Sequence, residues 1–182
     1  MAKAQRKTID TVFILLGTAM TTVLLVVGGL ALYGYHFATN SVRTELSQQK
    51  VYFPPKGSAA ITALPAADQQ EMNKYVGQQL VNGQQAKVYA NNFINVHLQE
   101  VAGGQTYAEV STAALKDPTN PKLQAEKQTL FQGETLRGLL LGDGYAYWTF
   151  GILAMYSAIA AFIGAGVMAI LVLMGLAHLS KL

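Results

Sequence analysis

The sequence predicts an all-α membrane protein in which two transmembrane helices flank a small extracytoplasmic helical domain. Only 13% of the 182 residues are charged, against about 25% in an average soluble domain. Charged residues are absent from two long blocks of the sequence. The segment between these blocks contains residues that typically start and end helices. The predicted boundaries are a tail at 1–10, a first span at 11–38, the extracytoplasmic domain at 39–143, a second span at 144–177 and a tail at 178–182.

The first uncharged block lies between Asp10 and Arg43 and contains the apolar run 12–37. A bilayer core about 30 Å thick requires roughly 20 helical residues, so this run is long enough to cross it. A cleaved signal peptide is the alternative, because basic residues precede the run. The apolar region of a signal peptide has only about 7–15 residues, however, and the run 12–37 is longer. A retained span is therefore expected.

The second uncharged block covers 144–180, with an apolar core at 148–176 that predicts a second, longer span. The intervening residues 43–143 balance nine basic against nine acidic side chains, so the net charge of +3 belongs to the two tails. The positive-inside rule then places both tails in the cytoplasm of a plasma-membrane protein, with 39–143 outside. This distribution argues against nucleic acid as a partner, because no basic patch remains in the central segment.

Aromatic residues cluster where each span is expected to meet the outer surface. Tyr and Trp favour the headgroup layer, where the ring is buried and its polar atom stays hydrated. We expect an interfacial belt here rather than an aromatic binding site. The belt comprises Tyr33, Tyr35 and Phe37 after the first span, and Tyr145, Tyr147 and Trp148 before the second.

The central segment predicts a series of short helices. The first span is expected to continue to Lys50, until the 52–57 segment, which contains two prolines, forces an extended turn. Pro65 suits the first position of a helix whose apolar face includes Met72 and Leu80, and Gly83 after Asn82 suits its end.

Further along the central segment, apolar residues recur at three- and four-residue steps over 86–101, which predicts a helix that Gly103 and Gly104 terminate. Thr106 and Glu109 form a capping-box pattern for a short helix. A last helix is expected from Pro121 to about residue 141, where the 142–144 segment, Gly-Asp-Gly, is expected to break the chain before the membrane.

Small residues recur along the second span and predict close helix packing. In lipid, small side chains let helices approach closely, which is a main source of their association. The two spans packing on each other accounts for part of this pattern, and contact with a second protein is the further hypothesis, because the small residues extend around more than one face. The predicted packing and partner residues are Ser157, Ala160, Ala161, Gly164, Ala165 and Ala169 in the second span, with Gly28 and Gly29 in the first.

Residues that could support catalysis are sparse. His97 and Glu100 give an H-x-x-E pair on one helical face, but no third metal ligand is adjacent, and a packing role is the simpler interpretation. His36 and His178 belong to opposite ends of the predicted spans. The sequence also lacks cysteine and every motif of a nucleophile elbow, a zinc protease or a phosphate loop. We therefore expect no catalytic residues, no metal and no cofactor.

Four segments of the chain are distinctive: VYFPPKGS (51–58), YANNF (89–93), HLQEVAGG (97–104) and GETLRGLLL (133–141). They resemble a family of actinobacterial membrane proteins of uncharacterised function, with two spans each. Members often carry the automatic label of aromatic ring-opening dioxygenase, which we reject here because the histidines cannot converge on iron. The layout is also similar to that of small accessory subunits of actinobacterial respiratory supercomplexes.

The sequence thus favours a non-enzymatic accessory or scaffolding subunit of a larger plasma-membrane complex. Its expected partners are the bilayer and other integral membrane proteins, with subunits of a cytochrome bc/oxidase-type respiratory supercomplex as the first candidates. An extracytoplasmic ligand sensor that signals through a partner is the alternative. An enzyme built on His97 and Glu100 is a third hypothesis.

Overall fold

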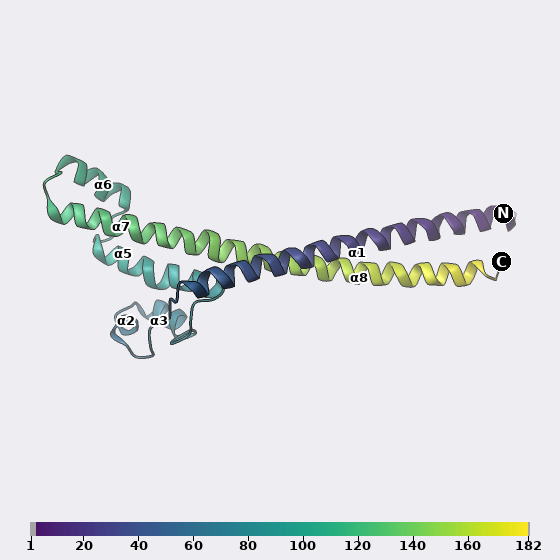
Figure 1. The fold of residues 1–182 in the computed structure, drawn as a ribbon, viewed down its shortest axis with the longest axis horizontal. Coiled ribbons are helices and arrows are strands. Elements are labelled where there is room, and N and C mark those ends of the chain that lie inside the picture. The colour runs from purple at the N-terminus through teal and green to yellow at the C-terminus, as the bar shows by residue number, and fades with distance from the viewer. Residues whose placement is uncertain (1–2, 182) are drawn as a thin grey trace. The chain divides into compact units, whose positions relative to one another are not determined.

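The computed structural model describes residues 3–181 and is helical along most of its length (Figure 1). Helices make up 81% of the chain, and no strand occurs in the described range beyond one isolated bridge between Tyr52 and Gln79. The helices are α1 (Lys3–Gln48), α2 (Ala59–Thr62), α3 (Ala66–Asn73), α4 (Gly83–Tyr89), α5 (Asn95–Val101), α6 (Tyr107–Lys116), α7 (Pro121–Leu139) and α8 (Tyr147–Leu179), with two π-helical segments, η1 (Ala90–Ile94) and η2 (Leu140–Ala146).

Two continuous helices are long and apolar enough to cross a membrane, at Gln5–Gln48 and Pro121–Leu179. Only 11% of the most apolar window of each is buried by the rest of the chain. Apolar surface left open to this extent is typical of helices that face lipid. The all-helical class and the two candidate spans are therefore confirmed.

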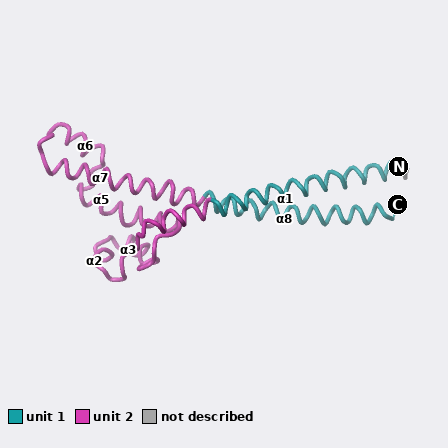
Figure 2. The backbone as a smooth tube through the Cα atoms, viewed as in Figure 1, with its two compact units in different colours: residues 1–37, 150–182 teal, residues 38–149 magenta. Residues whose placement is uncertain are grey.

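The chain divides into two compact units, coloured separately in Figure 2. Residues 1–37 and 150–182 form one unit, which we call the apolar hairpin, and residues 38–149 form the other, which we call the helical domain. Helices α1 and α8 each contribute to both units.

The apolar hairpin is an antiparallel pair of helices. A Cβ atom added to Gly17 of α1 would lie 2.7 Å from Val172 of α8, and one added to Gly28 would lie 2.8 Å from Phe162. Later residues of α1 therefore contact earlier residues of α8. Less exposed positions repeat at alternating steps of three and four residues, as in a left-handed coiled coil. These positions are Asp10, Ile14, Gly17, Thr21, Leu24, Gly28, Ala31 and Tyr35 in α1, and Gly151, Ala154, Ala158, Ala161, Ala165, Met168, Val172, Gly175 and Leu179 in α8.

The helical domain is built around a core of large side chains. Phe53, from the turn after α1, is 1% exposed and packs between the rings of Tyr75 and Tyr89, with centroids 5.3 Å from each. The core extends through Met72 and Leu80 to Leu130 of α7. Burial of this apolar surface is the main source of the domain's stability.

Several predicted helix limits are confirmed. Helix α1 continues to Gln48 before the proline-rich turn. Gly103 and Gly104 end α5 with φ angles of +57° and +84°, which L-residues with side chains rarely adopt. Helix α6 starts with the predicted capping box between Thr106 and Glu109.

Two predicted helix ends are wrong. Asn82 and Gly83 begin α4 instead of ending the previous helix: the Asn82 side chain accepts a hydrogen bond from Gln85 N, while α3 has already stopped at Asn73. The 142–144 segment does not break the chain but continues as the π-helix η2 from α7 into α8. Its Gly144 is needed for packing, because a Cβ there would lie 3.0 Å from Ala86 Cβ of α4.

Candidate functional surfaces

The predicted small residues of the spans fall into two groups. Ala161 and Ala165 are buried in the seam of the apolar hairpin at 7% and 2% exposure, and Gly28 lies under the ring of Phe162. Gly164 borders the seam, since its Cβ would lie 3.4 Å from Leu24. Gly28, Ala161 and Ala165 therefore serve the packing of the chain on itself, and Gly164 lies at the border between the two groups.

The other small residues of the spans stay outside the seam. Ser157 and Ala160 are exposed on α8, and with Gly164 they form a flank at steps of three and four residues. Ala169, which is half-buried, and the exposed Gly166 lie on the opposite flank. We call Ser157, Ala160 and Gly164 the small-residue flank.

On α1, Gly29 is exposed, and a Cβ atom added to it would have no atom from beyond its own turn of the helix within 4 Å, in contrast to Gly28. Gly29 is therefore not needed for packing within the hairpin. Gly28, the preceding residue, is needed for this packing, so two adjacent glycines have different surroundings.

The aromatic residues predicted to form a belt have different surroundings in the two units. In the apolar hairpin, Tyr33 and Phe37 are exposed and stacked, with ring centroids 6.2 Å apart. In the helical domain, Trp148 packs against the core and covers Gly83, while Lys87 Nζ lies 4.7 Å from the centroid of the Tyr145 ring. Tyr35, half-buried in the hairpin, and Tyr147, 38% exposed in the domain, complete the set.

The histidines are dispersed. His97 Nδ1 lies 2.8 Å from the carbonyl oxygen of Phe93, one turn earlier, and its ring packs on the Phe93 ring at 4.5 Å. His178 Nε2 approaches Asp10 Oδ2 at 4.0 Å across one end of the hairpin, and His36 packs beside Tyr35 nearer the other. No group of three His, Cys, Asp or Glu side chains in residues 3–181 is arranged to hold a metal ion.

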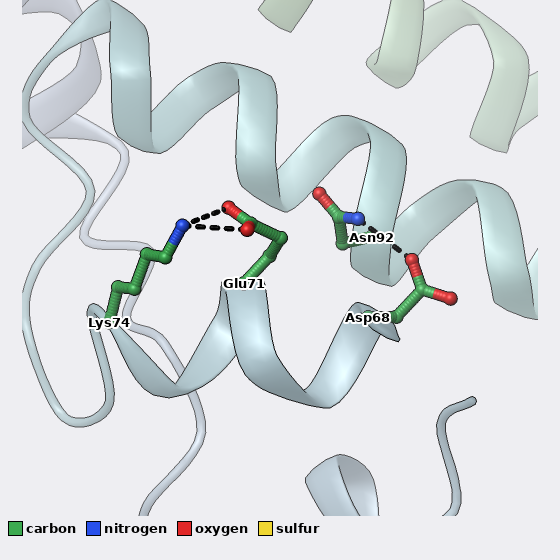
Figure 3. A network of polar contacts seen from close by, with 4 residues as sticks. All are labelled: Asp68, Glu71, Lys74 and Asn92. Atoms are coloured by element: carbon green, nitrogen blue, oxygen red, sulfur yellow. Dashed lines mark hydrogen bonds and ion pairs between the residues drawn. The ribbon is translucent and has the colours of Figure 1, made fainter. Parts of the chain in front are cut away.

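The asparagines of the π-helix η1 contact two neighbouring helices, α3 and α7. Asn92 Nδ2 donates to Asp68 Oδ1 of α3 at 2.7 Å, next to the Lys74–Glu71 ion pair (Figure 3). One residue earlier, Asn91 Oδ1 accepts a long hydrogen bond of 3.5 Å from Arg137 of α7. Adjacent side chains of a helix point in different directions, so Asn91 and Asn92 reach different neighbours.

Arg137 also forms an ion pair with Glu134, one turn earlier on α7. Its Nη1 donates to Glu134 Oε2 at 3.1 Å. The pair is partly exposed, so its direct contribution to stability is small, at most about 1 kcal/mol.

A polar cleft with a volume of about 460 Å³ lies beside this network and is not apparent from the sequence. Its lining combines carboxylates and amides, and within the described part of the chain it includes no Lys or Arg. The lining residues are Pro65, Asp68, Asn91, Asn95, Val96, Gln99, Glu100 and Gly104. Glu100 therefore belongs to the wall of a cleft, while His97 is not among the lining residues.

A second depression, with a volume of about 440 Å³, lies between the end of α1 and the α7–η2 helix. We call it the acidic groove, because each wall contributes a carboxylate to an otherwise apolar or uncharged surface. Its lining consists of Ser41, Val42, Glu45, Leu46 and Gln49 from one wall, and Leu136, Leu139, Leu140, Asp143, Gly144 and Tyr147 from the other. The sequence signal is a three- and four-residue spacing on both walls, but their pairing depends on the tertiary fold.

Two ionisable groups of the helical domain have shifted pKa values. Burial raises the pKa of the Tyr89 phenol above its ordinary value of 10.0. Hydrogen bonds from the backbone N–H and the hydroxyl of Thr106 lower the pKa of Glu109. Neither residue lines the polar cleft or the acidic groove.

Known proteins add no further guide to function. No family model, no curated protein and no solved structure matches this chain.

Proposed function

We propose that the chain is a non-enzymatic accessory or scaffolding subunit of a larger plasma-membrane complex. The observation that supports this is the distribution of small residues around α8. Ala161 and Ala165 are buried against α1, whereas Ser157 and Ala160 remain exposed beside Gly164. An additional flank of small residues gives a second helix room to approach α8 closely, which favours association in lipid.

The proposed topology has both tails in the cytoplasm and the helical domain outside. Basic residues near the ends of the two apolar helices, Arg6, Lys7 and Lys181, support this orientation through the positive-inside rule. The approach of His178 to Asp10 brings the corresponding ends of α1 and α8 together, as a two-span arrangement requires.

Subunits of a cytochrome bc/oxidase-type respiratory supercomplex are the first partners to test, because the predicted layout is similar to that of their small accessory subunits. In this role the two apolar helices would bind along a larger membrane subunit, and the helical domain would lie against its outer surface. The remaining proposed partner is the bilayer itself, and no nucleic acid is involved.

The experiment is purification of the tagged full-length chain from its native membranes in a mild detergent, with quantitative mass spectrometry of the co-eluting proteins. We expect a defined set of integral membrane proteins at constant ratio. Ala160→Leu, which fills the small-residue flank, should reduce their recovery at least several-fold. Ala19→Leu is the matched control, because Ala19 is an exposed alanine on α1, away from that flank. Equal recovery with both variants, or a strictly solitary protein, would contradict the proposal.

An extracytoplasmic ligand sensor is the second candidate, and the polar cleft is the observation that favours it. Amide and carboxylate groups such as Asn95, Gln99 and Glu100 can recognise a polar or cationic small molecule. A sensor binds its ligand without other subunits. Thermal-shift measurements with sugars, amino acids and polyamines would therefore show stabilisation by one class, which Asn95→Leu and Gln99→Leu should abolish. The accessory role alone predicts no such stabilisation.

A further inference from the structure

We propose that the acidic groove binds a small amphiphilic cation, a molecule with one positively charged head and an apolar body of the alkylammonium type. The inference goes beyond the accessory role and does not depend on it. The groove lies entirely within the helical domain, between residues 41–49 and 136–147. Its volume of about 440 Å³ falls in the range of about 300–1,000 Å³ that is common for small-molecule sites.

The floor and rim of the groove suit an apolar body. Val42, Leu46 and Leu140 are buried at 3%, 5% and 5% exposure and form a preformed apolar floor. Leu136 and Leu139 are 45% and 54% exposed although they line the same depression. Covering these two leucines with an apolar group would remove apolar surface from water, which is favourable.

The charges of the groove select the head group. Glu45 comes from α1 and Asp143 from η2, so each wall supplies one carboxylate. Neither carboxylate forms a hydrogen bond or an ion pair within residues 3–181, in contrast to Glu71, Glu109 and Glu134, which all have partners.

Among the residues that the structure describes, no Lys or Arg lines the groove, and its other polar side chains, Ser41 and Gln49, are neutral. An ammonium head would pair with the two carboxylates, whereas an anion of the same shape would be repelled by both. Charge complementarity and the apolar floor therefore converge on a cationic amphiphile.

Both walls of the groove are helices, and the wall formed by η2 packs against α4. The groove is therefore formed without its ligand. On the α1 wall, residues 41, 42, 45, 46 and 49 share one helical face. On the other wall, Gly144 is fixed by contact with Ala86 of α4, and Trp148 of the next turn covers Gly83. A preformed site loses less entropy on binding.

The test uses Trp148, the only tryptophan, which follows the groove residue Tyr147 directly. The full chain in nanodiscs of zwitterionic lipid is titrated at pH 7 with octylamine, which is protonated at that pH, and in parallel with octanoate and 1-octanol. We expect a saturable change in Trp148 fluorescence with octylamine alone. Octanoate and octanol, which have similar chains, report partition into the lipid.

Substitutions then assign the binding to the groove. Glu45→Gln combined with Asp143→Asn should weaken octylamine binding at least tenfold. Glu71→Gln combined with Glu126→Gln removes the same charge outside both the acidic groove and the polar cleft and should leave the binding unchanged. Leu139→Ser, which removes the apolar rim, should weaken binding several-fold while the preference for the cation is kept.

Three outcomes would overturn the proposal: similar saturable binding of octanoate or octanol, unchanged binding in the Glu45→Gln/Asp143→Asn variant, or no saturable binding at all. A second copy of the chain as occupant is a separate outcome. Because the chain has no cysteine, Leu139→Cys treated with an added oxidant reports it through a disulfide-linked dimer. A dimer yield that octylamine, added before the oxidant, does not reduce would also overturn the proposal. None of these results affects the co-purification test of the accessory role.

Discussion

The apolar hairpin and the helical domain reach stable packing by opposite means. The hairpin brings its backbones together over glycine and alanine and leaves most large apolar side chains outside, such as Leu153 and Ile163 at 60% and 64% exposure. The helical domain buries its large side chains instead, with Phe53 and Met72 at 1% and 0% exposure. The same all-helical chain therefore follows two packing rules.

The difference follows from the surroundings in which each unit is proposed to fold. In water, burial of a large apolar side chain contributes roughly 1.5–3 kcal/mol to the free energy of unfolding, so the helical domain is stabilised by its buried apolar side chains. In lipid this gain disappears because the solvent is itself apolar, and close contact between backbones becomes the main contribution. Substitutions in one unit, compared with their counterparts in the other, test whether the two rules hold.

The largest effect is expected for Phe53→Ala in the helical domain. Removal of a ring that packs between Tyr75 and Tyr89 should lower the free energy of unfolding by about 3–5 kcal/mol, because a cavity remains. The counterpart in the hairpin is Phe162→Ala, at a ring that is 39% exposed, and its effect should be much smaller. Denaturant unfolding followed through Trp148 measures the first variant, and equal losses in both variants would contradict the comparison.

In the hairpin the sensitive positions should be the small ones. Gly28→Leu places a side chain where the Phe162 ring lies 2.8 Å from the Cβ position, and overpacking of this kind costs about 1–3 kcal/mol. Gly29→Leu is the control, since no atom beyond its own turn of α1 lies within 4 Å of its Cβ position. The two substitutions are identical and adjacent, so a difference between them can only reflect the seam.

A disulfide reports whether the seam is intact. Cysteines at Gly34 and Ala154 would have Cβ atoms 3.9 Å apart, close to the mean of about 3.8 Å in disulfides. We expect this pair to oxidise readily in the otherwise cysteine-free chain, as measured by loss of maleimide labelling. Adding Gly28→Leu should reduce the yield and adding Gly29→Leu should not. Efficient oxidation in both backgrounds would show that the seam is not formed by Gly28.

Features with a local cause could be predicted from the sequence. The uncharged blocks identify the apolar helices, and the spacing of Thr106 and Glu109 identifies a helix start, because the partners of each hydrogen bond lie within one turn. The recurrence of small residues in α8 also predicts close packing. It does not reveal that Ala161 enters the seam while Ala160 stays outside, since that depends on the register with α1.

Features with a tertiary cause could not be predicted. Gly144 is typical of a helix break, but contact with Ala86 of α4 makes the glycine a packing residue within a continuous helix. Asn82 with Gly83 is ambiguous, because both residue types occur at either helix end. The acidic groove joins residues far apart in sequence, such as Glu45 and Asp143, so only the fold reveals it.

A smaller effect on stability is expected at Asn82, which starts α4 although the sequence pattern predicted the end of the preceding helix there. Asn82→Ala removes the acceptor for Gln85 N, 3.0 Å away, and should lower the stability of the helical domain by about 1 kcal/mol. Asn82→Gly should cost only a few tenths of a kcal/mol, because glycine is tolerated at this position. If Asn82 instead ended a helix, glycine would match or exceed asparagine in stability. Denaturant unfolding through Trp148 distinguishes the two orders.

The smallest effect is a pH dependence confined to the start of α6. The pKa of Glu109 is lowered in the folded chain by hydrogen bonds from Thr106, so the folded state binds this proton less readily than the unfolded state does. The stabilisation is therefore complete above the ordinary Glu pKa of 4.5 and is lost as the pH falls through the lower, folded value. Amide hydrogen exchange at Glu109 and Val110 should accelerate in this range relative to the intrinsic rate, and Glu109→Gln should remove the dependence. The apolar hairpin has no capping box of this kind among its described residues, so its amides provide the internal reference, and a parallel change there would indicate general loosening instead of the loss of one cap.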